Sequence, residues 1–167
     1  VLENELISQE DEKQMQLAFD IISAIRNMRQ ELEIGLTNRI EIKLTPRNKT
    51  DKDSLSQLTP YIKNLARVDK LTFTEKYILS KNEYATLLRN MHIVMPLQGI
   101  VDVGEVYKKN QTKIDKLKSE IKNKDTMLSN IDFLKNAPKE IVEAEKTKLD
   151  DLRQQVIKLE VIKNGLC

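Results

Sequence analysis

Residues 105–128 read EVYKKNQTKIDKLKSEIKNKDTML, and residues 138–159 read PKEIVEAEKTKLDDLRQQVIKL. In both stretches a seam position recurs at alternating spacings of three and four, and nearly everything between the seam positions is charged or polar. This spacing predicts two helices that each carry one narrow apolar stripe. A stripe this narrow cannot be buried in a globular core, so we expect the two helices to pack against each other as a hairpin. The seam residues are Tyr107, Asn110, Ile114, Leu117, Ile121, Lys124 and Leu128 in the first helix, and Val142, Glu145, Leu149, Leu152, Val156 and Leu159 in the second.

The residues around the two helices predict where each helix begins and ends. Asp102 and Glu105 form an N-terminal capping pattern. Residues 129–137 are expected to form the corner, in which Phe133 and Leu134 close the tip as an apolar plug, and Pro138 suits the first position of the second helix. With about 1.5 Å of rise per residue, a hairpin of two ~25-residue helices should extend roughly 35–40 Å.

The chain before the hairpin predicts one helix and then a small α/β module. Ser8 is expected to cap the helix, and Gly35 to end it with a left-handed residue. Its apolar face contains Ala18, Ile21, Ile22, Ile25, Met28 and Leu32. Alternating apolar residues then predict a strand at 40–44. A second helix is expected to start at Asp53 or Ser54, with Leu55, Leu58, Ile62 and Leu65 facing inward, and to kink or begin anew at Pro60.

Further alternation predicts a second strand at 71–73. Residues 84–88 and 92–97 predict two more strands, joined by a turn at Arg89-Asn90, although a helix over 82–90 is an alternative that periodicity does not exclude. The fold class is therefore α+β. We expect an N-terminal helix over 1–36, a small α/β module over 37–101, and a long antiparallel two-helix coiled-coil hairpin over 102–167.

Composition agrees with a helical binding module. The chain has 167 residues, of which 32% are charged, 40% hydrophobic and 4% aromatic. No apolar run approaches the length of a membrane span. The one cysteine, Cys167, excludes an internal disulfide, so we expect a cytoplasmic protein with a free terminal thiol. We also expect the protein to be monomeric. Because the sequence starts with Val1 rather than Met, we also expect it to be part of a longer protein.

The sequence contains little that could perform catalysis. The single histidine, His92, has no acidic partner or nucleophile in its predicted strand, so a structural role is expected. No Gly-rich phosphate loop, metal-spaced cluster or nucleophile elbow is present, so we expect no catalytic residue, metal or cofactor in this chain. The outgoing helix is rich in lysine and could lie along a phosphate backbone. A solvated surface of mixed charge is the alternative.

Four stretches, in order along the chain, resemble the valyl-tRNA synthetase family. They are IRNMRQE at 25–31, LAR at 65–67, MPLQGIVD at 95–102, and the corner, with LSN at 128–130, Phe133, AP at 137–138, Glu140, Val142, Glu143, Glu145 and KL at 148–149.

The resemblance implies a parent class I enzyme that uses ATP to join valine to its tRNA. Residues 1–36 would end the anticodon-binding domain, residues 37–101 would be a connector, and residues 102–167 would be the arm that leans on the outer corner of the tRNA, where the D and T loops meet. The family's HIGH and KMSKS signatures are absent from this sequence, so it carries no catalytic site of its own. The implied partner is tRNA rather than DNA or a membrane.

The expected RNA contacts are basic side chains of the arm, which would hold phosphates without reading bases. The candidates are Lys108, Lys109, Lys113, Lys116 and Lys122 on the outgoing helix, and Lys135 and Lys139 near the tip. Phe133 could stack on an exposed base pair, or serve only as the plug. Arg26 and Arg29 could face the anticodon stem, although packing salt bridges are the role that we favour.

Two other readings remain at this point. A coiled-coil adaptor would bind proteins, ignore RNA and form oligomers through the seam. A hairpin of another RNA-associated protein, such as a seryl-type synthetase or a ribosome-associated ATPase, is disfavoured by the α/β module that leads into the arm.

Overall fold

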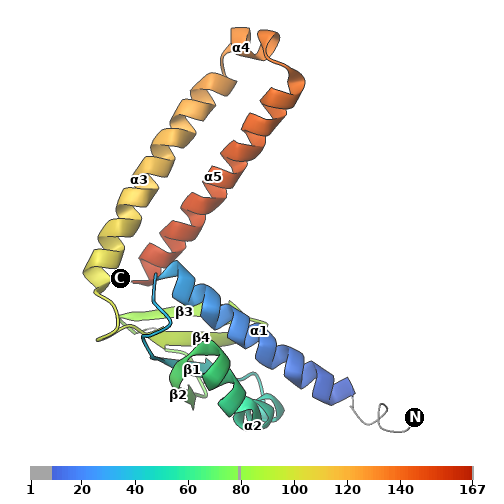
Figure 1. Ribbon diagram of the computed structural model, residues 1–167, viewed down its shortest axis with the longest axis vertical. Coiled ribbons are helices and arrows are strands. Elements are labelled where there is room, and N and C mark those ends of the chain that lie inside the picture. The colour runs from blue at the N-terminus through green and yellow to red at the C-terminus, as the bar shows by residue number, and fades with distance from the viewer. Residues whose placement is uncertain (1–8, 79, 167) are drawn as a thin grey trace. The chain divides into compact units, whose positions relative to one another are not determined.

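The computed structural model describes residues 9–78 and 80–166, in two compact units whose boundary in the chain lies between Asp102 and Val103. The expectations that Ser8 caps the first helix and that Cys167 is a free thiol lie outside the described residues. The first unit contains both the N-terminal helix and the α/β module, and the second unit contains the hairpin (Figure 1).

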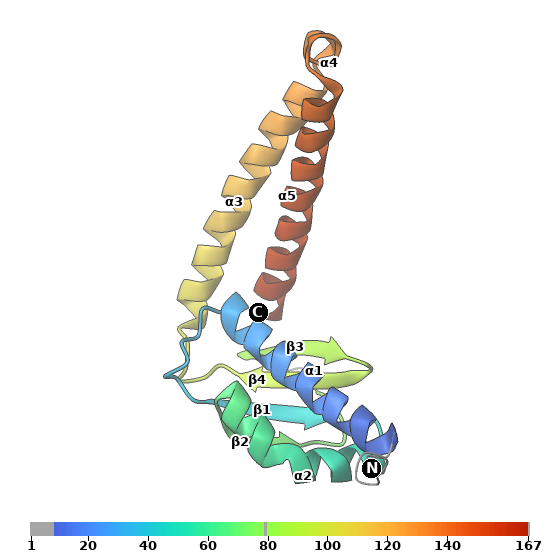
Figure 2. The same cartoon turned by 45° about the vertical axis from the view of Figure 1, so that its right-hand side comes forward.

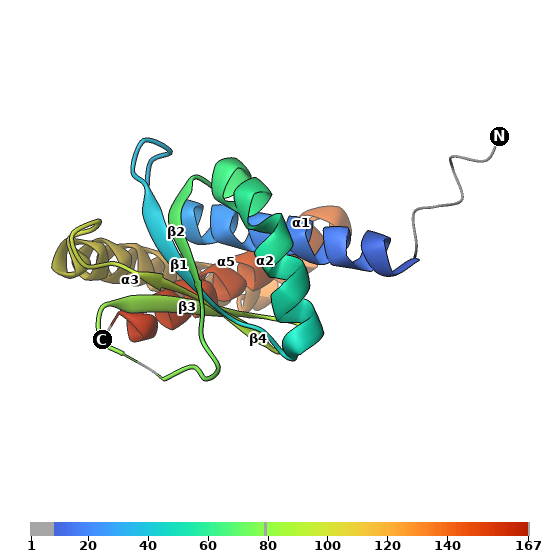
Figure 3. The ribbon, with the colours of Figure 1, turned by 90° about the horizontal axis from the view of Figure 1, so that it is seen from below.

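The first unit is a four-stranded sheet with two helices on one face (Figures 2 and 3). Strand order is β2-β1-β4-β3, with β1 parallel to β2 and antiparallel to β4, and β3 antiparallel to β4. The predicted α+β class is therefore confirmed. The elements are α1 (Gln9–Glu31), β1 (Ile40–Thr45), α2 (Lys49–Ala66), β2 (Val68–Phe73), β3 (Glu83–Leu88) and β4 (Met91–Pro96).

The core lies between the two helices and the sheet. Alternate residues of β1 and β4, such as Ile42 and Ile93, are fully buried, as are Ile21 and Ile25 of α1. Burial of one such side chain contributes about 1.5–3 kcal/mol. The core positions predicted from period-two alternation in these strands and from helical spacing in α1 are thus confirmed as buried. On the other face of the sheet His92 stacks on Tyr77, with ring centroids 4.6 Å apart.

The choice between hairpin and helix over residues 82–90 is settled by the turn. Arg89 and Asn90 have φ values of 47° and 64°, both in the left-handed region. Two successive left-handed residues define the tight turn that suits the twist of a β-hairpin. Leu88 and Met91 are paired across it, so the predicted strands are confirmed and the helix is excluded.

Two helix ends differ from the prediction. Glu33, not Gly35, is the left-handed residue after α1 (φ 55°), and the N–H groups of Glu33 and Ile34 donate to the carbonyls of Gln30 and Arg29, which satisfies the end of the helix. The helix α2 starts at Lys49, because Oδ1 of Asn48 accepts from the N–H of Asp51.

Pro60 lies inside α2 rather than at its start. The carbonyl that loses its partner belongs to Ser56, which is exposed and can bond to water. Leu55 and Ile62 are buried as expected, but Leu65 is 41% exposed and Ala66 takes the inward position at the end of the helix.

One buried arginine ties together the ends of three elements of the first unit. The guanidinium of Arg29, 2% exposed, donates to four carbonyls, namely those of Ala66 (3.1 Å), Gly35 (3.0 Å), Asn38 (2.8 Å) and Arg67 (2.5 Å). The carbonyls of Ala66 and Arg67 lie at the end of α2, and those of Gly35 and Asn38 lie in the segment that leads from α1 to β1. The charged donor therefore satisfies backbone groups that no regular element could satisfy.

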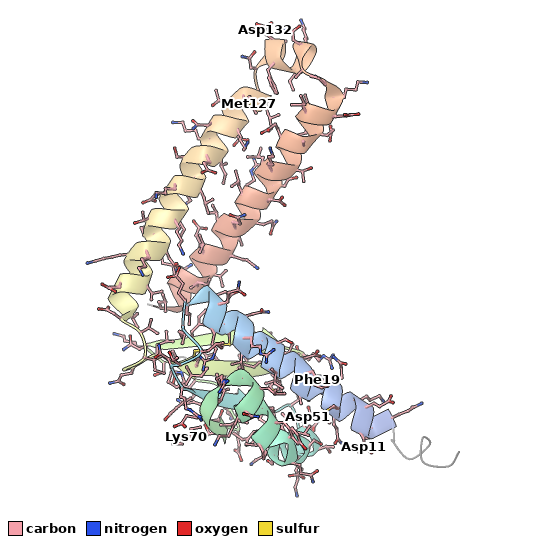
Figure 4. All side chains as sticks on the ribbon, viewed as in Figure 1. Asp11, Phe19, Asp51, Lys70, Met127 and Asp132 are labelled. Carbon is pink, nitrogen blue, oxygen red and sulfur yellow. The ribbon has the colours of Figure 1, made fainter. Side chains whose placement is uncertain are left out.

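The second unit is the predicted hairpin, made of α3 (Val103–Leu128), α4 (Ile131–Asn136) and α5 (Lys139–Gly165). Side chains of α3 and α5 fill the space between the two ribbons (Figure 4). Ile114 is 1% exposed, and Leu149 and Val156 are 6% and 7% exposed, so the predicted seam is buried at these positions. Tyr107, which was predicted to begin the seam, is 36% exposed. Among the described residues, no helix combines the length and the apolar character that crossing a membrane requires.

The corner differs from its prediction. Residues 131–136 form a short helix, because Oδ1 of Asn130 accepts from the N–H groups of Asp132 and Phe133. Phe133 is partly buried, but Leu134 is 42% exposed, so the predicted two-residue plug is wrong for Leu134. Pro138 precedes α5 as its cap residue instead of being its first residue.

Two seam positions are polar, and they differ in how they are satisfied. Lys124 Nζ lies 2.5 Å from Oε2 of Glu145 across the seam, so an ion pair replaces an apolar contact there. Asn110 is only 3% exposed, and its Nδ2 has no hydrogen-bond partner among the described residues. A buried amide without a partner lowers stability.

We expect Asn110→Leu to raise the free energy of unfolding of the hairpin by about 1–3 kcal/mol, because it removes an unpaired buried amide and extends the apolar seam. Thermal unfolding followed by circular dichroism at 222 nm would measure the change. Asn123→Leu is the matched control, since Asn123 is exposed on the same helix and its replacement should have little effect. Equal midpoints for the two variants would contradict the prediction.

We expect Arg29→Met to lower the free energy of unfolding of the first unit by more than about 3 kcal/mol, because four backbone carbonyls lose a charged donor. Arg26→Met is the control. The Arg26 guanidinium donates only to the carbonyl of Leu65, at an exposed site, so its loss should cost about 1 kcal/mol. Urea unfolding of both variants would measure the difference. Similar losses of unfolding free energy in the two variants would contradict the prediction.

Candidate nucleic-acid interface

All seven candidate lysines have exposed side chains. Five lie on α3, Lys135 lies on α4, and Lys139 is the first residue of α5. Exposure alone does not place them on one surface, because successive residues of an α-helix are rotated by about 100°.

The five lysines of α3 divide into two groups. Lys109, Lys113 and Lys116 follow each other at spacings of four and three, so they share one side of the helix, which we call the lysine side. Lys108 and Lys122 are rotated by about 100° and 140° from Lys109, so Lys108 lies on the face turned away from the seam and Lys122 lies on the other flank of the seam. A backbone that runs straight along α3 could therefore contact one group or the other, but not both.

The side opposite the lysine side is dominated by ion pairs between the two helices. Lys118 Nζ is 2.8 Å from Oε1 of Glu160, and Arg153 Nη2 is 2.9 Å from Oδ1 of Asp125. We call this the ion-paired side. Lys122 lies one turn beyond Lys118, which places it here. Because the carboxylates neutralise the basic side chains locally, this side has little excess positive charge.

These ion pairs favour the charged forms of the groups involved. The hydrogen bond between Lys118 and Glu160 raises the pKa of the lysine and lowers the pKa of the carboxyl group. At the seam, the hydrogen bond from Lys124 is the main cause that lowers the pKa of Glu145, and Lys148 adds to the effect. The helices are thus joined by groups that stay ionised at neutral pH.

The tip presents apolar as well as basic side chains. Lys135 and Lys139 are exposed, and Phe133 is partly buried, so its ring is only partly available for stacking. Ile131 and Ile141, which the sequence analysis did not single out, are 65% and 50% exposed, and Leu134, which was predicted to be part of the plug, is 42% exposed. The missed signal was the spacing of Ile131 and Leu134, which share a face only when the corner is helical.

The structure gives Arg26 and Arg29 packing roles. Both guanidinium groups donate to backbone carbonyls, and Arg29 is buried, so it cannot reach a ligand while the first unit is folded. A structural role was the one favoured from sequence, but the predicted partners were carboxylates. The true partners are carbonyls at chain turns, which only the tertiary structure brings together.

A metal site needs a set of donor side chains close together. No group of three or more His, Cys, Asp or Glu side chains in the described part of the chain could hold a metal ion. The hollow along α3, lined by Lys118, Lys122 and Asp125 among others, is open. A hollow of this kind does not enclose a small substrate.

Comparison with known proteins agrees with this geometry. Residues 102–166 match the family described as "Valyl tRNA synthetase tRNA binding arm". The chain is 30% identical to a valine–tRNA ligase of Aquifex aeolicus over 93% of its own length and 13% of the relative. It is 32% identical to the enzyme of Francisella tularensis over 84% of its own length and 15% of the relative.

The enzyme of Thermotoga maritima matches 99% of the chain at 25% identity, over 18% of the relative. The chain thus spans less than a fifth of the length of each of these ligases. The similarity nevertheless runs through both structural units, and the family match at residues 102–166 spans all three helices of the hairpin. The chain belongs to the valyl-tRNA synthetase family, and its helical hairpin is the tRNA-binding arm of that family.

Proposed function

We propose that this chain is the tRNA-binding C-terminal region of a valine–tRNA ligase, and that its hairpin holds tRNA through the phosphate backbone. The ligase as a whole would join valine to its tRNA with ATP, as a cytoplasmic monomer, and the chemistry would take place in parts of the enzyme other than these residues. The observation that carries the proposal is the lysine side of α3, a row of three exposed lysines on an arm of the matching family.

The electrostatics of the hairpin support the lysine side as the contact surface. Lys109, Lys113 and Lys116 occupy about two turns of α3, bounded by Glu105 and Glu120 on the same side of the helix. Lysine heads held at one-turn spacing can each approach a phosphate, and release of the bound counterions favours binding. Lys122 lies on the ion-paired side and Lys108 is rotated by about 100° from Lys109, so we do not assign either of them to this surface.

The tip suits a different kind of contact. Its exposed apolar residues Ile131 and Leu134 can rest on a flat base-pair surface, while Lys135 and Lys139 can approach the neighbouring phosphates. Folded RNA is recognised mainly by shape and backbone, and the outer corner of tRNA exposes a base pair of this kind. We therefore propose that the tip meets the tRNA corner, with Phe133 supporting the apolar surface from within.

The protein-adaptor alternative has one observation in its favour. Ile157 and Val161 lie one turn apart on α5 and are 53% and 62% exposed. A protein partner could cover them, and binding would then be indifferent to RNA.

We expect Lys109→Glu/Lys113→Glu/Lys116→Glu to weaken binding to a valine tRNA transcript by at least about tenfold, and to reduce the slope of log K against log salt by about three, roughly one unit per lost phosphate contact. Fluorescence anisotropy across a salt series would measure both quantities. Lys108→Glu/Lys122→Glu/Lys146→Glu makes the same change in net charge away from the lysine side, and should weaken binding much less.

A non-cognate tRNA should bind the wild-type chain about as well as valine tRNA, because backbone contacts carry no sequence information. Wild-type binding that is absent at low salt, or that is unaffected by either triple variant, would reject the arm as a backbone holder. Self-association of an RNA-indifferent chain would then favour the adaptor.

A further inference from the structure

A second group of basic side chains lies in the first unit, where β1 and β2 begin side by side. Ile40 and Val68 are partners in the parallel ladder, so Arg39 and Arg67, which precede them, are neighbours. Arg29 confirms the proximity, because its Nη2 donates both to the carbonyl of Arg67 and to that of Asn38. The starts of the two strands thus bring together side chains that are far apart in the sequence.

The last turns of α2 complete this group. Arg39 and Lys63 line one surface hollow of about 380 Å³, together with Thr59, Pro60, Asn64 and Val68. Arg67 is the residue after α2, with φ 56°, and its N–H donates to the carbonyl of Lys63. We call Arg39, Lys63 and Arg67 the basic corner.

The positive charge of the basic corner is poorly compensated. In the described part of the chain its one ion pair joins Arg39 to Asp69 at 3.7 Å, with both side chains about two-thirds exposed, a geometry that contributes little in water. Burial and the positive charge of Arg67 lower the pKa of the Arg29 guanidinium, so a further uncompensated charge lies directly behind the corner.

The same arrangement removes an obstacle to anion binding. The C-terminal end of a helix carries partial negative charge on its last carbonyls, which repels phosphate. Here Arg26 donates to the carbonyl of Leu65, and Arg29 donates to those of Ala66 and Arg67. An anion that approaches Lys63 and Arg67 therefore meets carbonyls that already have cationic partners.

We propose that the basic corner is a second contact surface for the RNA backbone, separate from the hairpin. Guanidinium groups match phosphate oxygens with two parallel hydrogen bonds. Arg39 and Lys63, which line the hollow, together with the neighbouring Arg67 can hold adjacent phosphates. The choice of RNA over an acidic protein segment rests on the proposed function of the arm. The residues themselves, and their excess charge, do not depend on it.

The test compares two double variants in the whole 167-residue chain. Arg39→Glu/Lys63→Glu reverses two charges of the basic corner. Lys49→Glu/Lys52→Glu makes the same change at the other end of α2, roughly 17 Å away at about 1.5 Å per residue. Both pairs of side chains are solvent-accessible, and Arg67 is left intact because its carbonyl is a partner of Arg29. Circular dichroism melting would confirm that both variants fold.

We expect the corner variant to weaken binding to a tRNA transcript by about tenfold and to lower the salt slope by about two, whereas the control should change affinity by less than about threefold. Should the corner variant not fold, Arg67→Asn replaces it. Asparagine tolerates the left-handed conformation, and removal of one cation should lower the salt slope by about one.

Equal effects of the corner and control variants would overturn the inference, since net charge alone would then explain the loss. A corner variant that binds tRNA like the wild type but no longer binds a polyglutamate peptide would overturn it in favour of an acidic protein partner. The variant of the lysine side separates the two proposals. If only the lysine-side variant loses tRNA binding, the proposal for the arm stands and the proposal for the basic corner fails. If only the corner variant loses tRNA binding, the proposal for the basic corner stands and the proposal for the lysine side fails. Wild-type protein that binds no tRNA would overturn both.

Discussion

The narrow apolar seam between α3 and α5 is the constraint on which the arm depends. A two-helix hairpin has no interior beyond this seam, and its buried apolar side chains include Ile114, Leu149 and Val156. Everything outside the seam must tolerate water, which explains why the flanks consist of lysine and glutamate and why ion pairs such as Lys118–Glu160 join them. A surface built this way for stability is also a surface on which a polyanion can lie.

Periodicity predicted most of the fold because most elements here bury one face. The strand β1 and both long helices of the hairpin follow from alternation or helical spacing alone, whereas periodicity left β3 open to a helical alternative. The errors fall at helix ends, where single hydrogen bonds decide. Asn48 starts α2 several residues earlier than the apolar pattern suggested, Glu33 takes the left-handed position ahead of Gly35, and Asn130 makes a helix of the corner. A single capping hydrogen bond of this kind changes helix stability by about 1 kcal/mol, and the apolar pattern of the sequence does not reveal which residue forms it.

The candidate site was predictable as a list of residues but not as a surface. Sequence identified the exposed lysines of α3, whereas their division into two sides follows from helix geometry combined with the ion pairs of the partner helix. Arg26 and Arg29 were linked to RNA from a motif, yet their guanidinium groups belong to the carbonyls around the end of α2. Arg39, Lys63 and Arg67 were overlooked because they come from three segments that only the parallel pairing of β1 with β2 makes adjacent.

A row of lysines along a single helix has a physical shortcoming as a holder of RNA. Contacts to phosphates alone carry no sequence information, and a line of equivalent charges allows the backbone to slide along it and to rotate about it at little cost. A contact surface away from that line removes both freedoms without any base being read. A fixed backbone suits this purpose, and the backbone at the basic corner is held by the buried Arg29, which donates to the carbonyls of Arg67 and Asn38. Under the proposed function, orientation comes from charge placement alone, which suits a region that would position a folded RNA.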